Sequence, residues 1–271
     1  MNPGILRKAL RELAWPTAIA GAALLVVHLV FAWVLPGLLQ EFGGNLLQIG
    51  FIRNVVRAIF GTEFADHIDP ASLSVMPWAH PVGLAVIAAH TIVACTRVPA
   101  AEIDHGTIDI LLALPVSRWE VHRAEAAAWS ASALVVVLCG AAGNRIGNQL
   151  IPVEQRLAAT TRLYVVVNLY AFALALGSIT WIVAALSDRR GRALAGAFAI
   201  FIGSMLVSYL AQFVALAKYL SIASILRYFQ PIMIHQRGTW PVVHLVVLCA
   251  IAVVGWMLAG WIFARRDLPT G

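Results

Sequence analysis

The stretch EIDHGTIDILLALPVSRWEVHR, residues 102–123, is densely charged and lies between two long apolar runs at 79–99 and 121–142. Each run has about 20 residues, the length that an α-helix needs to cross the hydrocarbon core of a bilayer. The pattern predicts two membrane-spanning helices joined by a short polar connection. The pattern therefore indicates an integral membrane protein.

The overall composition agrees with this reading. Of 271 residues, 61% are hydrophobic and 12% are charged, and the mean hydropathy is +0.84; a soluble domain carries about 25% charged residues. The pI near 9.7 favours membrane orientation by basic loops over nucleic-acid binding. Cys95, Cys139 and Cys249 fall inside apolar runs without CxxC spacing, so we interpret them as small buried hydrophobes.

Hydropathy predicts an all-α integral membrane protein with six transmembrane helices. The expected spans are 14–39, 79–99, 121–142, 163–186, 193–217 and 241–264. Arginine is densest in the short connections of one side, above all in SDRRGR (187–192) and ARRD (264–267). Because cytoplasmic loops carry an excess of Arg and Lys, we expect both termini in the cytoplasm.

The connection after the first span has its own pattern. In NLLQIGFIRNVVRAIFG (45–61), apolar residues such as Ile52, Val56 and Ile59 share one side of a helical wheel, and Arg53 and Arg57 share the other. This arrangement predicts an amphipathic external helix that lies on the outer face of the bilayer.

Missing motifs exclude several energy sources and chemistries. A P-loop needs Gly directly before Lys, but the two lysines follow Arg7 and Ala217, and no HExxH zinc motif occurs. No acidic residue lies in the middle of a span, Glu125 coming closest, which disfavours a secondary transporter with an intramembrane carboxylate. An intramembrane enzyme, or a metal or assembly factor using His90 and Cys95, remains the alternative, although five residues is not a one-face helical spacing.

The opening stretch itself predicts a helix over 101–114 that ends at Pro115. On a helical wheel, one side carries a narrow polar stripe, and the apolar residues around it would rest on the cytoplasmic leaflet. The stripe consists of Glu102, His105, Gly106, Asp109 and Ala113.

This stretch resembles the signature of ABC transporter permeases of the ABC-2 type. The matching residues are Glu102, the pair Gly106-Thr107, Asp109, the pair Leu111-Leu112 and LPVSRWEV (114–121), with a further resemblance in LRYFQP (226–231). Family members often carry Lys where this chain has Arg123. In that family the segment between the second and third spans is a coupling helix that docks into a partner ATPase.

The resemblance implies a single transmembrane permease domain over 1–271, with no enzymatic activity of its own. The implied partners are a cytoplasmic ABC ATPase subunit, a second permease copy or sister permease, and membrane lipid, with no nucleic acid. ATP-Mg would bind the partner, and this chain would bind no cofactor. The implied ATPase-coupling residues are Glu102, His105, Gly106, Thr107, Asp109, Leu112, Pro115 and Arg118.

The same resemblance implies a six-span exporter in the cell inner membrane. The cargo path would follow the permease interface, between small residues such as Gly196, Gly203 and Ser204. Arg118 would anchor the exit turn to phosphate headgroups or to the ATPase. No residue identifies the cargo.

Overall fold

The computed structural model describes residues 2–46, 50 and 74–267. Within these ranges the chain forms helices and turns, and no strand occurs. The long helices are α1 (Pro3–Leu46), α6 (Pro81–Cys95), α9 (Arg118–Gln149), α10 (Ala159–Leu186), α11 (Arg190–Leu210) and α14 (Val242–Arg265). The shorter ones are α5 (Met76–Ala79), α7 (Glu102–Asp104), α8 (Ile108–Leu112), α12 (Ala215–Leu220) and α13 (Pro231–Arg237).

Five helices are long and apolar enough to cross a membrane, and a sixth span results if α6 is counted with its bent continuation to Asp104. The all-helical membrane fold predicted from hydropathy is therefore confirmed. Some boundaries differ, because α1 continues to Leu46 and α11 stops at Leu210, short of the predicted residue 217. Most of the predicted external helix at 45–61 lies outside the described residues.

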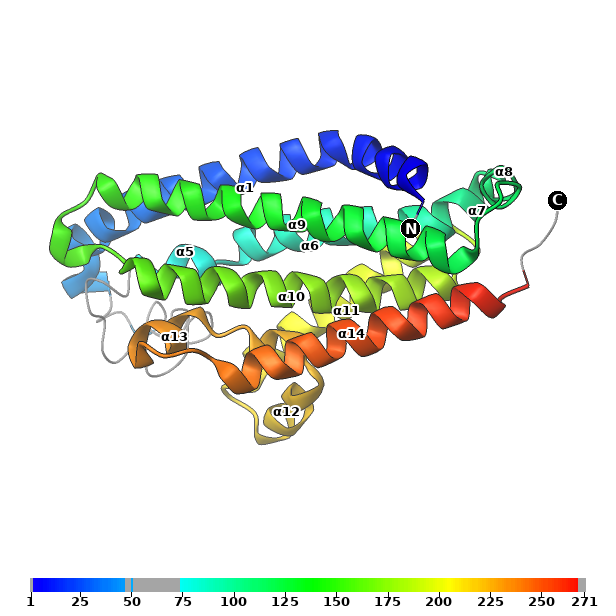
Figure 1. Cartoon of the computed structure of the whole chain (residues 1–271). Helices are drawn as coiled ribbons and strands as arrows, with labels where there is room; N and C mark the ends of the chain where they lie inside the picture. The colour runs from blue at the N-terminus through cyan, green and yellow to red at the C-terminus, as the bar shows by residue number, and fades with distance from the viewer. Residues whose placement is uncertain (1, 47–49, 51–73, 268–271) are drawn as a thin grey trace.

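The helices run alongside one another in an elongated bundle (Figure 1). α1 packs along α9, and α10 packs along α14; these are the two most extensive helix pairs. The start of α1 and the end of α14 lie at the same end of the bundle as α7 and α8, whereas α13 and the connection from α9 to α10 lie at the other (Figure 1).

Glycines on α9 allow α1 to approach closely. A Cβ atom on Gly143 would lie 2.1 Å from the carbonyl oxygen of Leu25, and one on Gly147 would lie 2.6 Å from that of Leu29. Both distances are far below van der Waals contact, so only glycine fits at these positions. Small residues at such crossings are typical of helices that pack in membranes.

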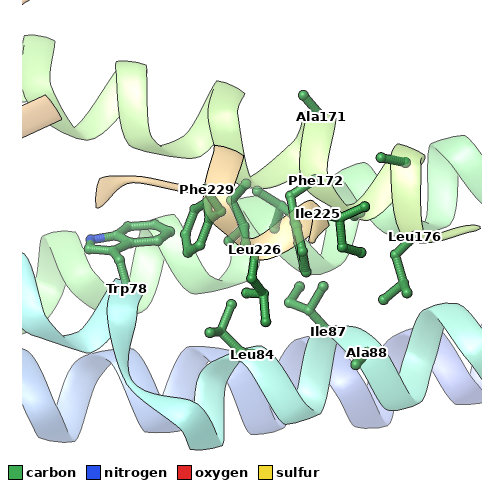
Figure 2. Close-up of a cluster of buried hydrophobic side chains, with 14 of the residues drawn as sticks. Trp78, Leu84, Ile87, Ala88, Ala171, Phe172, Leu176, Ile225, Leu226 and Phe229 are labelled. Carbon is green, nitrogen blue, oxygen red and sulfur yellow. The ribbon is translucent and has the colours of Figure 1, made fainter. Parts of the chain in front are cut away.

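In the described residues, the most extensive buried hydrophobic cluster joins side chains of α6, α9 and α10 to the segment that follows α12. Two 3₁₀ turns, Ser221–Ala223 and Ile225–Tyr228, follow α12 and bring Ile225, Leu226 and Phe229 toward Phe172 of α10 (Figure 2). The Asn168 side chain on α10 ties this segment down: its amide donates to the Tyr228 carbonyl at 3.1 Å, and its oxygen accepts from the Gln230 N–H at 3.1 Å. The turn is thus an integral part of the bundle.

Candidate functional site

The connection between the second and third spans begins at a sharp bend. α6 ends at Cys95, and the chain continues as a π-helical turn, Arg97–Ala101, at an angle of 56° to it. Val98 inside this turn has extended backbone angles, φ −125° and ψ 128°. Pro99 explains the break, because its ring disfavours a helical conformation in the residue before it. The bend redirects the chain away from α6.

Charged side chains from distant parts of the sequence meet at this bend. Arg97 pairs with Glu12 of α1, and its Nη1 atom lies 3.5 Å from Oε2 of Glu125 on α9. Lys8 Nζ lies 3.1 Å from Oε1 of Glu12 and 2.9 Å from Oε1 of Glu102. We call these five residues the charge cluster. It joins α1, the bend, α7 and α9.

Burial makes the pairing in the charge cluster necessary. The side chains of Arg97 and Glu125 are 13% and 7% exposed. A buried charge without a partner costs several kcal/mol, so each ion depends on the others for its presence there. Glu125 was predicted to lie near the end of a span, and the structure supplies the cation that accompanies it.

Beyond the charge cluster, the predicted single helix over 101–114 is replaced by two short ones. Gly106 adopts a left-handed conformation, φ 67°, between α7 and α8. This conformation ends a helix and strongly favours glycine. The Thr107 hydroxyl donates to the Glu102 carboxylate and so holds the turn from within.

The break changes which side chains face outward. Glu102, expected on an exposed stripe, is engaged with Lys8 and Thr107. Ile108 and Leu111 pack on Ile5, Val121 and other apolar side chains of the bundle, where contact with the leaflet had been predicted.

The outer surface of this segment keeps part of the predicted stripe and adds two apolar side chains. His105, Gly106, Asp109, Ala113 and Pro115 are exposed, as is Asp104, whose carboxylate accepts from the Arg190 N–H at 3.3 Å. Ile110 is 72% exposed and Leu114 is 48% exposed. Sequence analysis missed these two, although their i, i+4 spacing after Gly106 was available as a signal. Leu112 belongs to α8, but its side chain is outside the described set.

The exit from this segment is fixed by hydrogen bonds. Ser117 caps α9 in a capping box with Glu120. The Arg118 guanidinium donates to the carbonyl oxygens of Phe263 at 3.1 Å and Arg266 at 2.6 Å, which caps the end of α14. Arg118 therefore has an intramolecular role that sequence analysis did not predict, and its contact with headgroups or a partner stays a prediction.

The residues of the alternative reading are packed inside the bundle. His90 is buried, and its Nε2 lies 2.9 Å from Oγ of Ser132, which in turn lies 2.5 Å from Oγ1 of Thr17. Cys95 is a buried free thiol, as interpreted from the sequence, whereas Cys139 is half-buried and Cys249 is exposed, so the interpretation of all three as buried was wrong for Cys249. Among the residues that the structure describes, no group of three His, Cys, Asp or Glu side chains is placed to hold a metal ion.

Comparison with known proteins bears on the same segment. No curated protein and no solved structure matches the chain significantly. A family model described as ABC-2 family transporter protein matches residues 40–268, a range that includes the bend, α7, α8 and four of the long helices after them. The match covers most of the sequence, and the chain belongs to the ABC-2 family of transporter proteins, as a membrane permease.

Proposed function

We propose that this permease forms half of the translocation path of an ATP-driven exporter and is coupled to a separate cytoplasmic ATPase through α7 and α8. The observation that carries the proposal is the exposed apolar pair Ile110 and Leu114, presented at one end of the bundle on a segment that is anchored at its base. Apolar anchors surrounded by polar groups are the usual composition of a docking surface.

The surface around the apolar pair suits a charged groove. His105 and Asp109 are exposed beside Ile110, and Asp109 has no ion-pair partner within the described part of the chain. A carboxylate in this position is available to a basic group of the partner, and a charge-assisted hydrogen bond of this type is stronger than a neutral one. Glu102, by contrast, pairs with Lys8 and so helps to hold α7 on α1.

The contacts that hold α7 and α8 on the long helices provide a way to transmit a movement of α8 to the bundle. Ile108 and Leu111 pack against Ile5 of α1, Val121 of α9 and Phe263 of α14, and Glu102 adds the link to Lys8. A displacement of α8 by the ATPase therefore acts on three long helices together. ATP binding would shift the population between two arrangements of the bundle because the ATPase contacts them differently.

One chain would supply only half of the translocation path, and its sequence has no P-loop for ATP. A second permease, identical or a sister chain, would complete the path, and ATP-Mg would be held by the ATPase subunits. The face of α11 is a suitable contact surface, since a Cβ atom added at Gly203 would meet nothing within 4 Å. Both termini would lie in the cytoplasm, on the side of α7 and α8.

The experiment tests docking without changing the residues that hold α7 and α8 on the bundle. Ile110→Asp combined with Leu114→Asp is expected to abolish copurification of ATPase activity and transport in vesicles, with insertion unchanged, because both side chains are exposed. Val153→Asp is the matched control: Val153 is 67% exposed in the connection from α9 to α10, which lies at the opposite end of the bundle (Figure 1). Retention of ATPase activity by the double variant, or an equal loss in the control, contradicts the proposal.

A further inference from the structure

A cavity of about 670 Å³ lies between the end of α11, α12 and the turns that follow. Apolar side chains, among them Leu84, Met205 and Phe229, form part of its wall, and Lys218 and Arg227 supply cationic groups. The volume falls in the range of about 300–1,000 Å³ that is usual for sites of small molecules. α12, which borders the cavity, lies below the middle of the bundle in Figure 1, away from α7 and α8 at one end.

The two cations are held in the lining without a counter-charge. Arg227 Nη1 donates to the Lys218 carbonyl at 3.2 Å and to the Ser221 hydroxyl at 2.8 Å, which fixes the guanidinium against the end of α12. Within the described residues, no carboxylate lies within ion-pair distance of either side chain. Two neighbouring positive groups of this kind attract a phosphate, for which Arg and Lys are the usual ligands.

The surroundings of the cavity are apolar. Leu216 and Tyr219 on α12 are 68% and 73% exposed, and Phe213 before α12 is 59% exposed. In a chain that spans a membrane, an exposed surface of this composition is suited to contact with lipid. A molecule in the cavity would therefore meet cations on one side and hydrocarbon on the other.

We propose that this cavity binds a membrane phospholipid, with the phosphate diester at Lys218 and Arg227 and the upper part of an acyl chain along the apolar wall. An amphiphile satisfies both halves of the lining, whereas free phosphate satisfies only the cationic half. The site is separate from the proposed docking segment and does not depend on it.

The test uses the full-length permease purified in detergent without an ATPase, and native mass spectrometry measures bound lipid. Phosphatidylglycerol, diacylglycerol and inorganic phosphate are compared as probes. Lys218→Gln removes one cation that forms no ion pair with another described residue, and Ala215→Trp fills the cavity without a change of charge. Arg145→Gln is the matched control, because Arg145 is an exposed arginine that does not line the cavity.

Phosphatidylglycerol is expected to stay bound through detergent washing, while diacylglycerol is lost. Lys218→Gln should weaken phosphatidylglycerol binding by about tenfold, as expected for one charge-assisted hydrogen bond. Ala215→Trp should prevent binding, and Arg145→Gln should leave it unchanged. Equal retention in the wild type and either cavity variant, equal retention of diacylglycerol, or displacement of the lipid by millimolar phosphate would overturn the proposal.

Discussion

Arg97 Nη1 lies 3.5 Å from Oε2 of Glu125, so a cation from the bend after α6 stands beside a buried carboxylate of α9. The two partners are not equivalent. Arg97 also pairs with Glu12, whereas Arg97 is the only cation within ion-pair distance of Glu125 in the described residues. The loss of one partner therefore has a different effect from the loss of the other.

This asymmetry gives the first prediction. Arg97→Met leaves Glu125 buried without a cation and should lower the free energy of unfolding by about 3–5 kcal/mol. Glu125→Leu leaves Arg97 paired with Glu12 and should cost clearly less. Thermal unfolding in detergent, followed by circular dichroism, measures both. In the Arg97→Met/Glu125→Leu double variant, most of the loss should be recovered; additive costs would show that the pair is not coupled.

The second prediction concerns the contact between α1 and α9. Gly143→Ala places a methyl group 2.1 Å from the Leu25 carbonyl oxygen, so α1 must move, at a cost of about 1–3 kcal/mol. Gly203→Ala, where the added carbon meets nothing within 4 Å, should gain up to about 1 kcal/mol of helix propensity instead. The same thermal measurement decides, and equal effects at the two sites would count against close packing of the helices.

The third prediction concerns the hydrogen bonds from Arg118. Arg118→Gln removes the donor that caps Phe263 and Arg266, so the end of α14 should loosen. Trypsin should then cleave after Arg265 several times faster than in the wild type. Arg123→Gln changes an exposed arginine on the same helix and should leave the rate unchanged. Similar rates in all three proteins would mean that the cap does not hold the helix end.

The fourth prediction is topological. Arg189 and Gln149 are exposed; Arg189 directly precedes α11, and Gln149 ends α9 at the connection to α10, which lies at the end of the bundle opposite to α7 and α8 (Figure 1). In a background without the three native cysteines, because Cys249 is exposed, Arg189→Cys should react with an impermeant thiol reagent only from the cytoplasm. Gln149→Cys should react only from outside. Labelling of Arg189→Cys in intact cells would reverse the orientation.

Hydropathy was enough to predict the class of fold and the position of the polar connection. Long apolar runs have few structural alternatives in lipid, since every backbone group must be hydrogen-bonded within the protein. Two local features could also have been read from the sequence. Pro99 indicates the bend, and Gly106 indicates the break between α7 and α8, although the helical pattern of the neighbouring residues favoured one continuous helix.

The partners of the charged residues could not be predicted in the same way. Glu102 meets Lys8, which is 94 positions away, and Arg118 meets the Arg266 carbonyl, which is 148 positions away. A helical wheel shows which residues share a face but not which helix will cover that face. Glu102 was therefore placed on an open surface, and the charge cluster was not foreseen.

The glycines of α9 have a mechanical consequence. Close contact joins α1 and α9 into one helix pair, and the long contact between α10 and α14 forms a second pair. The contacts between α9 and α10, which connect the two pairs, are less extensive. Sliding one helix pair past the other therefore breaks fewer contacts than separating the two helices within either pair. The boundary between the two helix pairs is therefore where the bundle separates at the lowest cost in contacts. The Tyr170 hydroxyl of α10 donates to the Ser130 carbonyl of α9 at 3.2 Å and is one of the polar contacts across this boundary.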